Sequence, residues 1–98
     1  MNNSKIFFIE EVLSVVGDVR LVDEFSKIFD VVEHIIGKRP LTHQLSKALD
    51  ICIPELLRQY PNFKNIKFDV TEENYTEWLQ DKISIFGDMI AVKRMDIA

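Results

Sequence analysis

Three glycines divide this chain into segments with helical patterning. Gly17, Gly37 and Gly87 each stand where a run of apolar residues at helical spacing stops. Glycine is favoured directly after a helix end because it adopts a left-handed backbone there at little cost. The glycines therefore predict helix ends near these positions and a mainly helical fold.

The clearest helix is expected over residues 21–36, where apolar residues fall on one stripe and polar residues on the other side. The stripe consists of Leu21, Phe25, Ile28, Phe29, Val32, Ile35 and Ile36. Asp23 and Glu24 would then lie in the first turn, where the helix dipole favours acidic residues. Gly37 would end the helix, and Pro40 would prevent its continuation.

Two further helices are expected over residues 8–16 and 71–86, because apolar residues recur there at helical spacing. Thr71 is a suitable N-cap for the later helix, since its hydroxyl can accept a hydrogen bond from a free backbone N–H. Glu72 and Glu73 would occupy the first turn of that helix.

The central segment, residues 39–61, is amphipathic and contains Pro54 inside its apolar stripe. Proline cannot donate the helical hydrogen bond, and its ring presses on the preceding turn. In an exposed helix interior this costs roughly 3 kcal/mol. Because the stripe continues from Cys52 to Leu56, we expect a kinked helix, or one that ends near Cys52 and restarts with Pro54 in its first turn.

The last apolar segment, residues 88–95, alternates as a strand does, with Ile90 and Val92 on one face. A strand needs a partner for its backbone groups. Three segments are candidates for that partner: residues 5–9, 18–22 and 66–70. The sequence therefore predicts one compact domain over residues 1–98, mainly α (α+β), with about four helices and a small antiparallel sheet that uses the C-terminal strand.

The composition excludes several classes of protein. No apolar run approaches the roughly 20 residues of a membrane span, and the opening stretch MNNSKIFFIEEV lacks the features of a signal peptide. A single cysteine cannot form an internal disulfide, so we expect a reducing compartment, the cytoplasm. The net charge of -4 argues against a dedicated nucleic-acid binder.

The residues that most often carry chemistry lack the spacing of a catalytic or metal site. His43 and Cys52 are nine residues apart, about 900° on a straight helix, so they would point to opposite sides. A structural zinc site needs four nitrogen or sulfur ligands, and Cys52 lies among apolar residues, where it behaves as a small hydrophobe. The chain also lacks a glycine-rich phosphate loop. We therefore expect no enzyme activity, no metal and no cofactor.

Residues 42–61 carry a run of residues that matches a known pattern. The run consists of Thr42, His43, Gln44, Leu45, Ala48, Cys52, Pro54, Leu56, Leu57, Gln59 and Pro61. It resembles the core signature of a family of small, uncharacterised proteins encoded mostly by bacteriophages and prophages. The resemblance covers roughly residues 8–61, and the family usually has proline and arginine where this chain has Ser46 and Lys47. It implies a phage origin and no known activity.

The leading functional hypothesis is a non-enzymatic phage protein that binds a host protein, such as an inhibitor of a bacterial defence system acting on a CRISPR nuclease. It follows from the absence of a catalytic motif, the small acidic chain and the phage-like resemblance. An acidic surface can occupy a groove that is built for nucleic acid. The candidate contact residues are Glu10, Glu11, Asp18, Asp23 and Asp30.

Two alternatives remain open. Residues 38–60 hold four basic and two acidic side chains, so a nucleic-acid-associated regulatory module could use this basic segment. Its candidate surface residues are Arg39, Thr42, His43, Gln44, Lys47 and Arg58. Thr42 could instead serve only as a helix cap.

The other alternative is a self-associating structural protein. Several apolar residues lie off the main helical stripes and could pair two chains as a homodimer. These residues are Val22, Val31, Ile51, Ile53 and Ile85.

Overall fold

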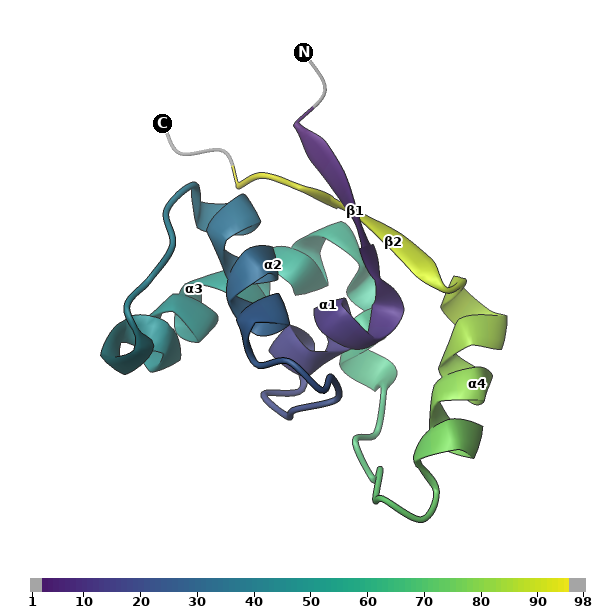
Figure 1. Cartoon of the computed structure of the whole chain (residues 1–98). Coiled ribbons are helices and arrows are strands. Elements are labelled where there is room, and N and C mark those ends of the chain that lie inside the picture. Colours follow the sequence, from purple (N-terminus) through teal and green to yellow (C-terminus); the bar gives the residue numbers. More distant parts are fainter. Residues whose placement is uncertain (1–2, 96–98) are drawn as a thin grey trace.

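The computed structural model describes residues 3–95, which form four α-helices, two short 3-10 helices and two strands (Figure 1). The elements in chain order are β1 (Ser4–Phe8), α1 (Ile9–Val16), α2 (Ser26–Ile36), α3 (Leu45–Gln59), α4 (Tyr75–Phe86) and β2 (Met89–Lys93). The 3-10 helices span Thr42–Gln44 and Pro61–Asn65, on either side of α3. The predicted class is confirmed, because four helices accompany an antiparallel sheet that includes the C-terminal strand.

The sheet joins the two ends of the described chain. β1 and β2 are antiparallel, with Ser4 opposite Lys93 and Phe7 opposite Ile90. Of the three partners considered for the C-terminal strand, the N-terminal segment is the correct one, and residues 18–22 and 66–70 are not strands. The pairing brings the apolar residues Phe7, Ile90 and Val92 onto one buried face of the sheet.

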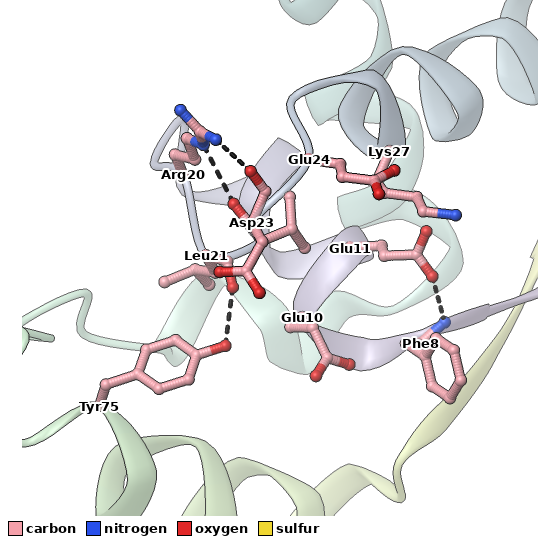
Figure 2. A pocket seen from close by; sticks show the side chains of 10 residues that line it. Phe8, Glu10, Glu11, Arg20, Leu21, Asp23, Glu24, Lys27 and Tyr75 are labelled. Atoms are coloured by element: carbon pink, nitrogen blue, oxygen red, sulfur yellow. Dashed lines mark hydrogen bonds between the residues drawn. The ribbon is translucent and has the colours of Figure 1, made fainter.

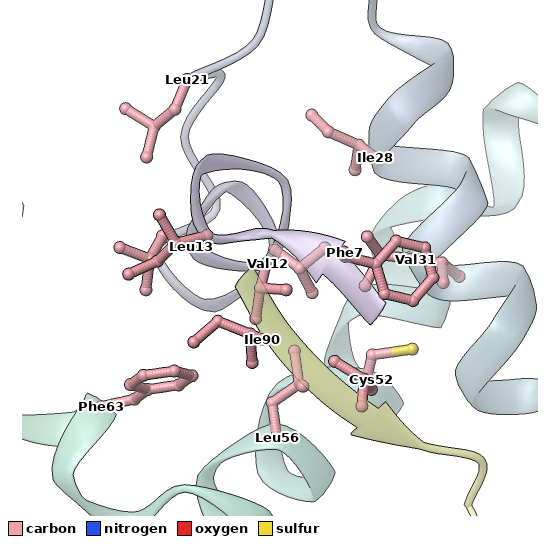
Figure 3. Packing of buried hydrophobic residues seen from close by; sticks show 14 of the residues in the cluster. Phe7, Val12, Leu13, Leu21, Ile28, Val31, Cys52, Leu56, Phe63 and Ile90 are labelled. Carbon is pink, nitrogen blue, oxygen red and sulfur yellow. The ribbon is translucent and has the colours of Figure 1, made fainter. Parts of the chain in front are cut away.

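The hydrophobic core lies between this sheet face and helices α1, α2 and α3 (Figure 3). Each helix supplies side chains that are fully shielded from solvent. They include Val12, Leu13 and Val15 from α1, Val31, Val32 and Ile35 from α2, and Cys52 and Leu56 from α3. Burying one large aliphatic side chain contributes about 1.5–3 kcal/mol, so these three helices and the sheet stabilise one another.

Helix α1 follows β1 without a loop. The backbone N–H of Ile9 donates to Asp88 O at 2.9 Å and so extends the ladder of the sheet to the first residue of the helix. The Glu11 carboxylate reaches back and accepts from the N–H of Phe8 at 3.0 Å. Phe8 thus belongs to the strand, and the helix begins one residue later than the sequence predicts.

Helix α2 begins at Ser26, so the predicted start near residue 21 is wrong, and Asp23 and Glu24 precede the helix. Arg20 holds the preceding loop, because its guanidinium donates to the carbonyl oxygens of Val22, at 3.0 Å, and Asp23. The end of the helix is as predicted, with Gly37 in the left-handed conformation at φ 81°.

Helix α3 runs continuously through Pro54, so the predicted alternative of a break near Cys52 is wrong. Pro54 is exposed, and its ring therefore faces solvent rather than the core. Thr42 does not cap the helix through its side chain. The Gln44 side chain caps the preceding 3-10 helix, since its Oε1 accepts from the N–H of Leu41 at 2.9 Å, whereas α3 begins without a side-chain cap.

Helix α4 begins at Tyr75 with Asn74 as the N-cap residue, so the cap predicted at Thr71 and the first turn predicted at Glu72 and Glu73 are wrong. Thr71 and Asn74 bond each other reciprocally, with donor–acceptor distances of 2.6 and 3.2 Å, and this closes a turn before the helix. In Figure 1, α4 stands on the opposite side of α1 from α2. None of the helices within residues 3–95 combines the length and apolar character that a membrane crossing requires.

Candidate functional site

A pocket of about 550 Å³ opens where β1 meets α1 (Figure 2). The start of α1, the loop before α2 and the first residue of α4 form its walls. Its charged lining residues are Glu10, Glu11, Arg20, Asp23, Glu24 and Lys27. Four carboxylates against two cations make the pocket acidic.

Ser14 ties the loop wall of this pocket to α1. Its side chain is buried, and Oγ donates to Glu10 O at 2.6 Å while accepting from the N–H of Leu21 at 3.0 Å. The Ser14 carbonyl oxygen also accepts from the N–H of Val19 at 3.1 Å. Sequence reasoning missed Ser14, although a serine inside the apolar run of residues 12–16 was an available signal.

Tyr75 closes the pocket from the side of α4. Its hydroxyl donates to Leu21 O at 2.7 Å, and Figure 2 shows the ring reaching across to the loop. Partial burial raises the pKa of the Tyr75 phenol, and the negative charges of Glu10 and Asp23 raise this pKa further. The hydroxyl is therefore a neutral hydrogen-bond donor throughout the physiological pH range.

The carboxylates of the pocket differ in what they contact. Glu11 is 8% exposed, and its carboxylate is occupied by the hydrogen bond that it accepts from the N–H of Phe8. Within residues 3–95, the side chains of Glu10, Asp23 and Glu24 make no hydrogen bond or ion pair. These three acids therefore remain available to a partner.

The two cations of the pocket do not neutralise it fully. Arg20 is turned toward backbone carbonyl oxygens of its own loop, and its guanidinium lies 6.0 Å from the centre of the Phe25 ring. Lys27 makes no ion pair within the described residues. The arrangement suits the binding of a positively charged group, because the carboxylates outnumber the cations and three of them have no side-chain partner within residues 3–95.

Residues 7–66 match the model of a protein family described as a domain of unknown function, DUF7736. The chain belongs to this family. The DUF7736 match covers about three fifths of the chain, from β1 through α3, and includes every pocket residue except Tyr75. Neither a curated protein nor a solved structure matches the chain. Membership of an uncharacterised family is thus shown, and the phage origin stays a prediction.

The DUF7736 fold brings together only part of the predicted acidic contact set. Glu10, Glu11 and Asp23 line the pocket. Asp18 lies in the turn after α1, with a left-handed backbone at φ 49°, and is not part of the pocket lining. Asp30 lies on α2 and accepts from Arg39 at 2.8 Å.

The basic segment is partly neutralised by α2. Arg39 bonds Asp30 at 2.8 Å and Glu33 at 2.9 Å, and these hydrogen bonds, that to Asp30 first, raise the pKa of the guanidinium. The other predicted residues of this segment, Thr42, His43, Gln44 and Lys47, are exposed on the 3-10 helix and the first turn of α3. Arg58 bonds Glu55 through Nε at 3.0 Å, so both arginines of the expected basic surface are engaged with carboxylates of their own chain.

Cys52 belongs to the core. Its side chain is inaccessible to solvent, and burial, with a smaller effect from the charge of Glu55, raises the pKa of the thiol to about 12. Within residues 3–95, no group of three His, Cys, Asp or Glu side chains is arranged to hold a metal ion.

We expect Cys52 to resist thiol reagents in the folded protein. At pH 8, a pKa of about 12 leaves on the order of one thiol in ten thousand as the reactive thiolate, and the core also excludes the reagent. Labelling with Ellman's reagent should be negligible in buffer and stoichiometric in concentrated urea. Complete labelling of the native protein within minutes would show that the thiol is accessible.

Proposed function

We propose that this protein acts by binding another protein, without catalysis, and that the acidic pocket is the contact surface. The observation that carries the proposal is a group of three carboxylates, Glu10, Asp23 and Glu24, around a pocket of about 550 Å³. These carboxylates make no hydrogen bond with any other group of residues 3–95. Phe8 lines the same pocket and is 54% exposed, and exposed aromatic residues are typical anchors of protein interfaces.

The partner would present a positively charged surface. Acidic groups gain binding energy and association rate when they meet a basic patch, and they disfavour partners of like charge. Basic patches are typical of proteins that bind nucleic acid. Together with the resemblance to phage proteins, this supports a host protein as the partner, and a bacterial defence nuclease is one such protein.

Nucleic acid itself has less support as the ligand. The pocket would repel phosphate groups, and Arg39 in the basic segment is already engaged by Asp30 and Glu33. We therefore favour protein binding through the acidic pocket.

The double variant Glu10→Lys and Asp23→Lys should lose the partner. Both substitutions reverse charges at the pocket, so binding should weaken at least about tenfold, which corresponds to about 1.4 kcal/mol. The measurement is affinity capture from a bacterial lysate, with the partner identified by mass spectrometry and then titrated as purified protein.

A second double variant, Glu72→Lys and Glu73→Lys, is the matched control. It changes the net charge equally, at exposed positions in the turn before α4 that are not part of the pocket lining. This control should bind as the unmodified protein does. Equal affinity of both double variants for the captured partner would refute the pocket as the contact surface.

A further inference from the structure

The acidic pocket continues into an open edge of the sheet. In an antiparallel pair, residues alternate between those whose N–H and C=O face the other strand and those that face away. The N–H of Ile9 donates to Asp88 O, and at the other end of the pair the N–H of Arg94 donates to Asn3 O. The residues on the β1 side that bond the opposite strand are therefore the odd-numbered ones. The N–H and C=O groups of Ile6 therefore point away from β2, along the free edge of β1.

The free edge and the pocket share a residue. The outward-facing N–H of Phe8 is bonded by Glu11, whose carboxylate lines the pocket (Figure 2). Ile6 is the next residue along the same edge that faces outward, and it is 61% exposed. Within residues 3–95, β2 is the only strand paired with β1, and no backbone group outside the sheet bonds Ile6.

The outer face of the sheet is apolar beside this edge. Ile6 lies opposite Ala91, and Phe8 lies opposite Met89. Ile6, Phe8 and Met89 are 61%, 54% and 47% exposed. A strand added to β1 would place alternate side chains next to Ile6 and Phe8 on this face.

We propose that the partner protein adds an extended segment to β1 as a third strand, paired with Ile6, and inserts a lysine or arginine side chain of that segment into the acidic pocket. The inference rests on the proposed function. Backbone hydrogen bonds at Ile6 would provide affinity, while the charge of the pocket and the apolar outer face would select the sequence of the segment.

A second copy of this chain fits the surface less well. A half-exposed large side chain offers about 100 Å², so the three exposed residues of two facing copies would bury about 600 Å² in total. Stable interfaces bury at least about 1,200 Å². The one cation of β1, Lys5, lies 5.3 Å from the centre of its own Phe7 ring and is not part of the pocket lining.

The substitution Ile6→Pro tests the added strand. Proline removes the outward N–H, and proline is tolerated on an edge strand where that N–H faces solvent, so the ladder between β1 and β2 keeps its bonds. Ile6→Thr is the matched control, because threonine keeps both the N–H and a high β propensity. The probe is a set of peptides selected on the unmodified protein from a display library of random twelve-residue sequences.

Selected peptides should combine a lysine or arginine with alternating apolar residues. Ile6→Pro should weaken their binding at least about tenfold, and Ile6→Thr should change it less than about threefold. Amide hydrogen exchange at Ile6 in the unmodified protein should slow when a peptide binds, and this measurement does not depend on how well Ile6→Pro folds.

The possible results separate the two proposals. In one result, the peptides bind Ile6→Pro and Ile6→Thr equally, do not protect the Ile6 amide, and fail to bind the Glu10→Lys and Asp23→Lys variant. This result would overturn the added strand and leave the pocket function standing. Peptides insensitive to all of these substitutions would refute both proposals. The strand inference would also be overturned if the selected peptides contained no basic residue, or if the selection enriched no peptide.

Discussion

The substitution Phe63→Ala should lower the free energy of unfolding by about 3–5 kcal/mol, a large part of the stability of a domain of this size. Phe63 is 1% exposed, and its ring lies 5.0 Å from the ring of Tyr60 in a stacked arrangement and 5.0 Å from that of Phe86 in an edge-on arrangement. Removing it leaves a cavity and breaks the two ring contacts through which Phe63, in the second 3-10 helix, connects the end of α3 to α4. Urea unfolding followed by circular dichroism measures the loss.

Phe25→Ala is the matched control for this prediction. Phe25 is 42% exposed and contacts Phe29 edge-on at a ring separation of 5.5 Å. Its replacement should cost less than about 1 kcal/mol, since little apolar area leaves water at this position. Equal losses for the two variants would contradict the assignment of Phe63 to the core.

The second large effect is expected at Ser14. The substitution Ser14→Ala removes the acceptor for the buried N–H of Leu21, and a buried donor left without a partner costs about 1–3 kcal/mol. The loop that forms one wall of the pocket would also lose its anchor on α1. Urea unfolding measures the free energy, and amide hydrogen exchange at Leu21 reports the loosening of the loop.

The chain offers a matched control for Ser14. Ser84 donates to the carbonyl oxygen of Asp81 at 2.9 Å, much as Ser14 donates to Glu10. Ser84 is exposed, however, and in the described part of the chain it accepts no bond from a distant segment. Ser84→Ala should change the stability by no more than about 0.5 kcal/mol. If Ser14→Ala costs no more than this control, the bond to Leu21 does not stabilise the loop.

Apolar periodicity predicted the existence of the helices well and their first residues poorly. Leu21 is buried as its place on the stripe suggests, but it is held by Ser14 and Tyr75 from a loop, and α2 begins only at Ser26. Periodicity reports which side chains are buried, and it cannot separate a buried helical residue from a buried loop residue. The strand over residues 89–93 was predictable from its alternation, whereas its partner depends on how the whole chain folds.

The candidate site was predictable in its charge and not in its geometry. The acidic N-terminal third of the sequence indicated Glu10 and Asp23 as contact residues. Their position around one pocket depends on the bond between Ser14 and Leu21 and on Tyr75, which comes from an element more than 50 residues later in the chain. The sequence also indicated Asp30 as a contact residue, but its carboxylate forms an ion pair with Arg39 and is therefore not one of the free acids.

Because β1 pairs with β2, the sheet can form during synthesis only after β2 has left the ribosome. Helices α1 to α3 can begin to associate during synthesis, but Phe7 stays without its cross-strand neighbour Ile90 until β2 has emerged. Closing a loop of this length costs about 4 kcal/mol of chain entropy. Between the synthesis of β1 and that of β2, the nascent chain therefore carries β1 as an unpaired strand with the apolar residues Ile6, Phe7 and Phe8.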